Sequence, residues 1–97
     1  MTKIKTLVID KKDNVATALE WLPNGSEITV ENHGALEKIK LVSDIPQGHK
    51  LALRDIKKGE SVIKYGEPIG QSLKKISRGE HVHVQNLASK PLAKGRR

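Results

Sequence analysis

The chain has 97 residues, a formal net charge of +7 and 36% hydrophobic residues. This length suits one domain with a modest core, which must be built from aliphatic side chains because Trp21 and Tyr65 are the only large aromatic residues. The absence of cysteine excludes a disulfide framework, a thiolate zinc site and a cysteine nucleophile. The apolar run at residues 6–9 is too short for a signal-peptide core or a membrane span, so we expect a soluble cytoplasmic protein.

The positive charge is concentrated at the two ends of the chain. Residues 1–12 hold four lysines against one aspartate, and residues 90–97 hold four basic residues and no acid. Residues 13–89 contain ten basic and ten acidic side chains, so the body of the domain is formally neutral. The basic tail has no interleaved aromatic residues on which bases could stack. Nucleic-acid binding is therefore a minority hypothesis, and a solvated, unstructured tail over residues 88–97 is favoured.

Short segments that alternate apolar and polar residues predict a mainly β domain over residues 1–87. In chain order, the predicted strands cover residues 4–9, 27–31, 37–42, 50–54, 61–64 and 81–85. One helix is predicted over residues 13–22, because apolar side chains recur there at helical spacing and Asp13 or Asn14 is placed to cap its start.

A four-residue turn pattern recurs along the chain: an aliphatic residue, two mostly polar residues, and glycine. Its four copies begin at Leu22, Ile45, Ile56 and Ile76. Glycine in the fourth slot suits the positive-φ position of a tight turn. The pattern indicates repeated turn chemistry in an all-β chain rather than a solenoid, and residues 32–34 and 65–68 add further turn signals.

The stretch GEHVHVQNL, residues 79–87, places two histidines two positions apart in a predicted strand. Successive side chains of a strand point to opposite faces, so His81, His83 and Gln85 are predicted on one face. Val82 and Val84 are predicted on the other face, anchored to the core.

Two imidazoles on one strand face can share a metal ion or an anionic ligand. A single pair leaves the ligand set of a metal incomplete, and His49 or His33 would add to it only if the fold brings their loops together. From the residues alone, a solvated strand face is the favoured interpretation, a ligand-binding surface the second and a self-contained metal site the third.

The segment IKYGEPIG, residues 63–70, places Lys64 and Tyr65 beside a turn, where an ammonium and a phenol can hold a carboxylate or phosphate. An ordinary hairpin with solvated side chains is the favoured alternative. The sequence contains neither a phosphate-binding loop motif nor GxSxG or HExxH. The residues alone thus describe a binding module, or part of a site that is completed elsewhere.

Three segments together carry a specific resemblance: DNVATAL (13–19), IPQGHKLALRDIKKGESVIKYGEPIG (45–70) and GEHVHVQNL (79–87). In order and spacing they resemble the N-terminal SAF-type domain of the altronate hydrolase and galactarate dehydratase family. They are also similar to the free-standing small subunit of two-component members of the sulfolactate sulfo-lyase type. The resemblance covers about residues 4–87 and implies a β-clip fold, a small and strongly bent β-structure.

The resemblance implies a lyase that removes water or sulfite from a sugar acid or related hydroxy acid. Such a β-elimination needs a base for the proton α to a carboxylate, a cation that stabilises the enediolate, and help for the leaving group. The family implies a divalent metal, iron or manganese, in the complete enzyme. It is expected mainly from a much larger catalytic domain or subunit, with none in this chain alone. The implied partners are a separately encoded large subunit and a small anionic substrate, without a membrane.

The motif match carries particular residues into this site. His83 and His49 are the catalytic candidates, and the substrate-binding candidates are Lys50, Lys64, Tyr65, His81, Gln85 and Asn86. One departure concerns Gln85, since relatives often have a third histidine at that position. Glutamine keeps a hydrogen-bonding group but is a poor ligand for a borderline metal, which weakens a metal role for this strand.

We interpret the chain as an accessory subunit that supplies one wall of an anionic substrate site. The alternative is a non-catalytic module that binds a carbohydrate or a polyanion on the same fold, and a degenerate homologue is a third reading, for which Gln85 is the only hint. Unpaired strand edges make self-association a general expectation as well.

Overall fold

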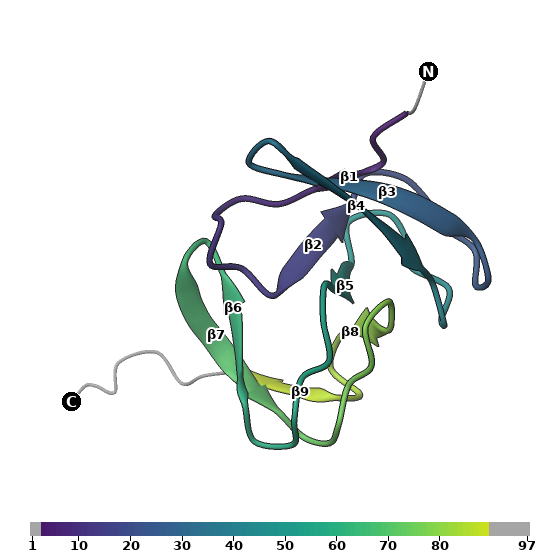
Figure 1. The fold of residues 1–97 in the computed structure, drawn as a ribbon. Coiled ribbons are helices and arrows are strands. Elements are labelled where there is room, and N and C mark those ends of the chain that lie inside the picture. The colour runs from purple at the N-terminus through teal and green to yellow at the C-terminus, as the bar shows by residue number, and fades with distance from the viewer. Residues whose placement is uncertain (1–2, 90–97) are drawn as a thin grey trace.

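The computed structural model describes residues 3–89, which form nine strands (Figure 1). They are β1 (Thr6–Leu7), β2 (Val15–Ala18), β3 (Glu27–Asn32), β4 (Ala35–Lys40), β5 (Lys50–Ala52), β6 (Ser61–Lys64), β7 (Glu67–Ser72), β8 (His81–Val82) and β9 (Leu87–Ser89). The prediction of a mainly β domain is confirmed. Residues 3–89 contain no helix that could cross a membrane.

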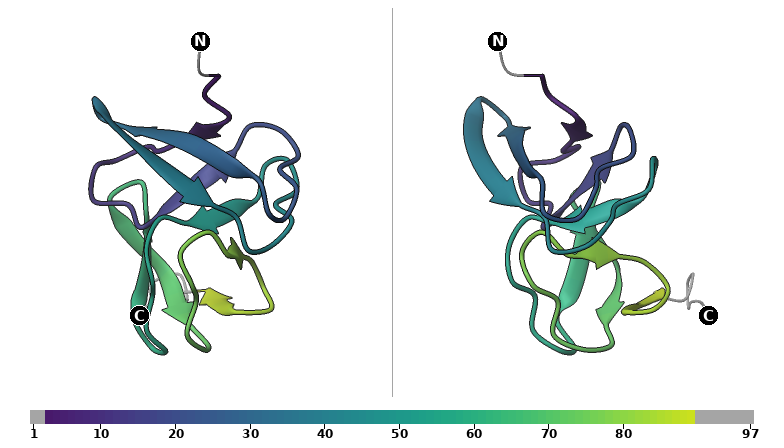
Figure 2. Two further views of the ribbon diagram at one scale, coloured as in Figure 1. Left: turned by 45° about the vertical axis from the view of Figure 1, so that its right-hand side comes forward. Right: turned by 90° about the vertical axis from the view of Figure 1, so that its right-hand side faces the viewer.

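The strands form three small antiparallel sheets. One has the order β1-β2-β5-β8, the second is the β3-β4 hairpin, and the third has the order β6-β7-β9. Figure 2 shows the β3-β4 hairpin and the β6-β7-β9 sheet at opposite ends of the domain, with β2 and β5 between them. Each end has its own aliphatic core, one around Leu22, Val30 and Leu51 and the other around Ile56 and Val82.

The prediction of a helix over residues 13–22 is wrong. This segment contains strand β2, which lies between β1 and β5 in the sheet. Val15, Ala16 and Ala18 are each 1% exposed. A central strand covered on both faces shows no alternation of apolar and polar residues, so its pattern resembles part of a buried helix. The side chains of Asp13 and Asn14 are bonded to the β6-β7 hairpin instead of capping a helix.

The four copies of the turn pattern adopt one repeated structure. Their glycines have φ between 83° and 88°, and each donates its N–H to a backbone carbonyl of another segment: Gly25 to Leu41, Gly48 to Ala18, Gly59 to Ser72 and Gly79 to Ala52. The aliphatic first residues pair across the fold as bridges, Leu22 with Ile45 and Ile56 with Ile76. All four are at most 1% exposed. The first slot is therefore aliphatic because it enters the core, and the fourth is glycine because it turns the chain.

Further differences from the sequence prediction concern the strand at residues 81–85 and the strands β7 and β9. The strand predicted over residues 81–85 ends at Val82, so Val82 is buried as predicted but Val84 lies in the following turn and is 75% exposed. β7 was not predicted, because Pro68 and Gly70 within it are typical of turns. β9 pairs with β7 and continues two residues beyond position 87. The remainder of the predicted tail, residues 90–97, lies outside the described residues.

Candidate functional site

The pairing of β5 with β8 brings the histidines of two distant motifs together. Lys50 pairs with Val82 and Leu51 with His81, and continuing this register by one residue places His49 opposite His83. The ring centroids of His49 and His83 lie 4.2 Å apart. His81 completes the group, with its ring centroid 5.1 Å from that of His49 and 5.5 Å from that of His83.

A hydrogen bond links two of these rings. Nδ1 of His49 lies 2.9 Å from Nε2 of His81, and Nε2 of Gln85 lies 3.2 Å from the other ring nitrogen of His81, Nδ1. An amide NH₂ only donates, so Nδ1 of His81 accepts this bond. Nε2 of His81 then carries the ring proton and donates to His49.

The backbone that carries His81 and His83 is fixed by Asn86. The Oδ1 atom of Asn86 accepts the N–H of His83 at 3.0 Å, and its Nδ2 donates to the carbonyl of His81 at 2.8 Å. Its side chain is fully buried. Asn86 was predicted to bind substrate; the structure places it behind the histidines, where it holds their loop.

The structure also gathers Lys50, Lys64 and Tyr65 around one another. Nζ of Lys64 donates to the Tyr65 hydroxyl at 3.0 Å and lies 4.4 Å from the centre of its ring. Burial, followed by the ammonium of Lys64, lowers the pKa of Lys50, and Tyr65 opposes this effect. Lys50 in turn lowers the pKa of His81 and of His83. These six side chains, His49, Lys50, Lys64, Tyr65, His81 and His83, form what we call the imidazole–lysine face.

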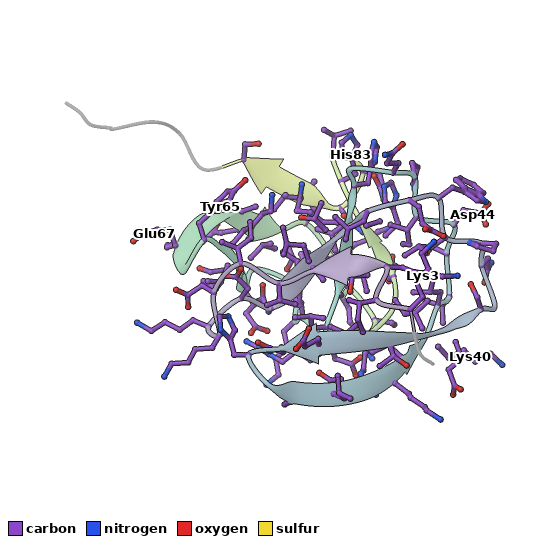
Figure 3. The ribbon with its side chains drawn as sticks, turned by 90° about the horizontal axis from the view of Figure 1, so that it is seen from above. Lys3, Lys40, Asp44, Tyr65, Glu67 and His83 are labelled. Carbon is purple, nitrogen blue, oxygen red and sulfur yellow. The ribbon has the colours of Figure 1, made fainter. Side chains whose placement is uncertain are left out.

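The pKa of His81 is lowered from its ordinary value of 6.5, first by burial and then by His49, His83 and Lys50, with Glu80 acting in the opposite direction. The pKa of His83 is lowered too, by burial, His49 and Lys50. At neutral pH these two imidazoles are consequently uncharged, and each offers a nitrogen lone pair to a proton or a metal ion. Figure 3 shows His83 and Tyr65 along one edge of the molecule, with Lys40 on the opposite edge.

Asp13 and Asn14 help to position the site, a role that the sequence analysis did not predict. The carboxylate of Asp13 accepts the N–H groups of Tyr65 and Gly66 at 3.2 and 2.8 Å. Asn14 donates to the carbonyl of Ser61 and accepts the N–H of Ile63. They hold the two-residue turn in which Tyr65 has φ of 60°, a conformation that is rare for a bulky side chain. In the sequence they are two adjacent polar residues before an apolar run. A helix cap has the same pattern, so the sequence predicts a cap at this place instead.

Three side chains in residues 3–89, His49, His81 and His83, form a group that could hold a metal ion, with their ligand atoms all within 4.8 Å of one another. The fourth histidine, His33, is not among them; it lies exposed in the β3-β4 turn. The sequence analysis left open whether His49 or His33 would join the pair, and the fold brings in His49.

Comparison with known proteins assigns the fold to a family. The family described as the altronate/galactarate dehydratase SAF domain matches residues 4–90. The chain belongs to this family. Among curated proteins, this SAF domain is 50% identical over 74 residues to altronate dehydratase of Escherichia coli K12. The match covers 76% of the chain but 14% of that enzyme.

The SAF domain also matches two shorter proteins. It is 54% identical over 46 residues to the alpha subunit of (2R)-sulfolactate sulfo-lyase of Chromohalobacter salexigens, covering 47% of the chain and 49% of the relative. It is 48% identical over 48 residues to the corresponding subunit of Paracoccus pantotrophus, covering 50% of the chain and 72% of the relative. The resemblance drawn from the sequence is thereby confirmed, and the relatives are lyases.

Proposed function

We propose that this SAF domain is the small subunit of a lyase that acts by β-elimination on a sugar acid or related hydroxy acid. The observation that carries the proposal is the imidazole–lysine face, in which three motifs distant in the chain supply three imidazoles, two lysines and a phenol. The relatives named as alpha subunits support a separate partner chain. The large share of altronate dehydratase that lies outside the match supports a larger catalytic part.

The face contains the groups that an elimination requires on one side of its substrate. Lys50, Lys64 and the hydroxyl of Tyr65 would hold the substrate carboxylate through charge-assisted hydrogen bonds. The imidazole of His83 or of His49 would take the proton from the carbon α to that carboxylate. The electron pair of the broken C–H bond would move onto the carboxylate as an enediolate and then form the C=C bond as the β-substituent leaves. A hydroxyl would leave as water with the proton held by the imidazolium, and a sulfonate would leave as sulfite with the electron pair of the C–S bond.

The remaining predicted residues would support these groups. His81 and Gln85 lie in hydrogen-bond contact beside His49, and they would orient it or meet a polar group of the substrate. Asn86 would act indirectly, because its side chain is hydrogen-bonded to the backbone of His81 and of His83 and holds these residues in place. A divalent metal in the complete enzyme would stabilise the charge of the enediolate. The large subunit would close the site from the opposite side and exclude water.

The proposal is tested by purifying the chain with its native partners. We expect co-purification of a large subunit and an eliminating activity that the separated chains lack, assayed on altronate, galactarate and (2R)-sulfolactate. His83→Ala should impair this activity, and His33→Asn, the matched control in the β3-β4 turn, should not. A complex that is fully active with His83→Ala, or the absence of any large partner, would remove the imidazole–lysine face from catalysis.

The second candidate function is a carbohydrate- or polyanion-binding module, favoured by the two lysines of the face and by the basic residues after position 89. It predicts binding to polyanions that weakens steeply with salt and is lost when residues 90–97 are deleted. The lyase subunit predicts that this deletion leaves the elimination rate unchanged.

A further inference from the structure

We propose that His49, His81 and His83 bind one divalent transition-metal ion in this chain alone, without the large subunit. The three side chains come from both sides of the β5-β8 pairing and are all partly exposed. Imidazole is a ligand for Zn, Fe, Ni and Cu, and three protein ligands with an open position are typical of catalytic zinc sites. This inference goes beyond the proposed function, because it requires neither a substrate nor a partner.

The distance between two of the nitrogens already suits an ion. Two imidazole nitrogens that bind one ion at about 2.1 Å lie about 3.0 Å apart at a right angle, or about 3.4 Å apart in a tetrahedral site. The observed separation between Nδ1 of His49 and Nε2 of His81 is 2.9 Å. The ion would replace the single proton that now links these two atoms.

The third ligand joins by a rotation of rings. The three ring planes lie within 17° to 26° of parallel, whereas an ion must lie near the plane of every ring that binds it. The torsion about χ2 of histidine is broad, so a ring that is not enclosed on all sides turns at low cost. Binding an ion through all three rings would therefore turn them out of the stacked arrangement.

Gln85 would take part in the change from the stacked arrangement of the rings to a metal-bound one. When Nε2 of His81 binds the ion, the ring proton resides on Nδ1, which becomes a donor instead of an acceptor. The amide of Gln85, now 3.2 Å from Nδ1 through its nitrogen, would then turn to present Oε1. An outer hydrogen bond of this kind fixes the tautomer and orientation of metal-binding histidines. Gln85 is therefore a positioning residue and not a ligand, which resolves why an amide stands at this place.

The charge around the site selects what fills the open positions. Lys50 follows His49 in the chain and pairs with Val82, which lies between His81 and His83, so its ammonium opposes a bare cation. An anion on the open positions offsets this repulsion, and a carboxylate would bridge the ion and Lys50. This last step rests on the proposed function.

The test uses a tag-free chain of residues 1–97, which is pretreated with EDTA, dialysed and then titrated with Co²⁺. We expect one equivalent of Co²⁺ per chain by calorimetry, a visible absorption band from nitrogen ligands, and a rise in Tm. His81→Gln and His83→Gln should each lower the affinity more than tenfold, while His33→Asn leaves it unchanged. Gln85→Ala should lower the affinity several-fold, and Gln85→Glu, which also accepts from Nδ1–H, should restore it.

Binding that is absent, or that His33→Asn lowers as much as His83→Gln, would overturn the proposal. Two ligand variants are used because a substitution at one ligand can unfold the domain, and urea unfolding of each variant identifies such a loss. The titration contains no large subunit and no hydroxy acid. A negative result accordingly leaves the lyase-subunit proposal standing, and an inactive complex leaves the metal proposal standing.

Discussion

His49 Nδ1 lies 2.9 Å from His81 Nε2, although the two residues are 32 positions apart in the chain. The contact follows from the antiparallel pairing of β5 with β8, which starts at Lys50 and Val82. It joins the GHK and HVH motifs into one site. The predictions below test the residues that make this site and those that support it.

Removing the imidazole of His83 should abolish most of the activity without unfolding the domain. We expect His83→Ala to lower kcat of the complex by about 10² to 10⁴, the usual contribution of a positioned acid or base. The urea midpoint should change little, because the ring is partly exposed. An equal loss in His33→Asn would show that the effect is not specific to the face.

The buried amide of Asn14 should be important for stability. Asn14→Ala leaves the carbonyl of Ser61 and the N–H of Ile63 without their partner, and we expect a loss of about 2–4 kcal/mol in the free energy of unfolding. Urea denaturation measures it. The control is Asn24→Ala, at an exposed position, with an expected change of about 0.5 kcal/mol.

Two glycines with nearly the same backbone conformation should differ in their tolerance of alanine. Gly25 has φ of 88° and Gly79 has φ of 86°, so both substitutions carry about 1–2 kcal/mol of backbone strain. A Cβ at Gly25 meets nothing within 4 Å, whereas one at Gly79 collides with the carbonyl oxygen of Lys40. Thermal unfolding should therefore show Gly79→Ala to be clearly less stable than Gly25→Ala. Equal losses would mean that the Lys40 backbone yields without cost.

Tyr65 should contribute to substrate binding rather than to the stability of the fold. Its φ of 60° costs about 1–2 kcal/mol in a non-glycine residue, so Tyr65→Gly should leave the free energy of unfolding unchanged or raise it slightly. The same variant should raise KM of the complex. Tyr65→Phe keeps the ring but removes the hydroxyl that Lys64 contacts, and a matching rise in KM would assign the effect to that hydroxyl.

Acid should destabilise the metal-free domain through His81. Its folded pKa lies below the ordinary 6.5, so below about pH 6.5 the unfolded chain binds this proton more readily than the folded one. The stabilisation is present above pH 6.5 and is lost as the pH falls through that value towards the folded pKa. Urea midpoints measured between pH 7.5 and 5 in EDTA should fall less for His81→Gln than for the wild type. An identical slope would remove His81 as the titrating group.

The turns show which part of the fold could be predicted from local sequence. The positive-φ glycine in the fourth slot is a requirement of each turn by itself, so the four copies could be predicted from the chain, and all four form. The segment at residues 13–22 shows where local sequence failed. β2 is covered on both faces by contacts distant in the chain, and such burial erases the alternation that would have marked a strand.

The sequence by itself determined the family and the mainly β class, and it supplied the residues that are proposed for the site, since these depend on residue types and on spacing along the chain. Only the tertiary structure decided which of them meet. It joined His49 to His81 and His83, left His33 in the β3-β4 turn, and turned Asn86 and Asn14 inward as supports. The register of β5 against β8 decides that His49 meets His81 and His83. This register is fixed by the burial of apolar side chains on both strands, which is a property of the whole fold rather than of either motif.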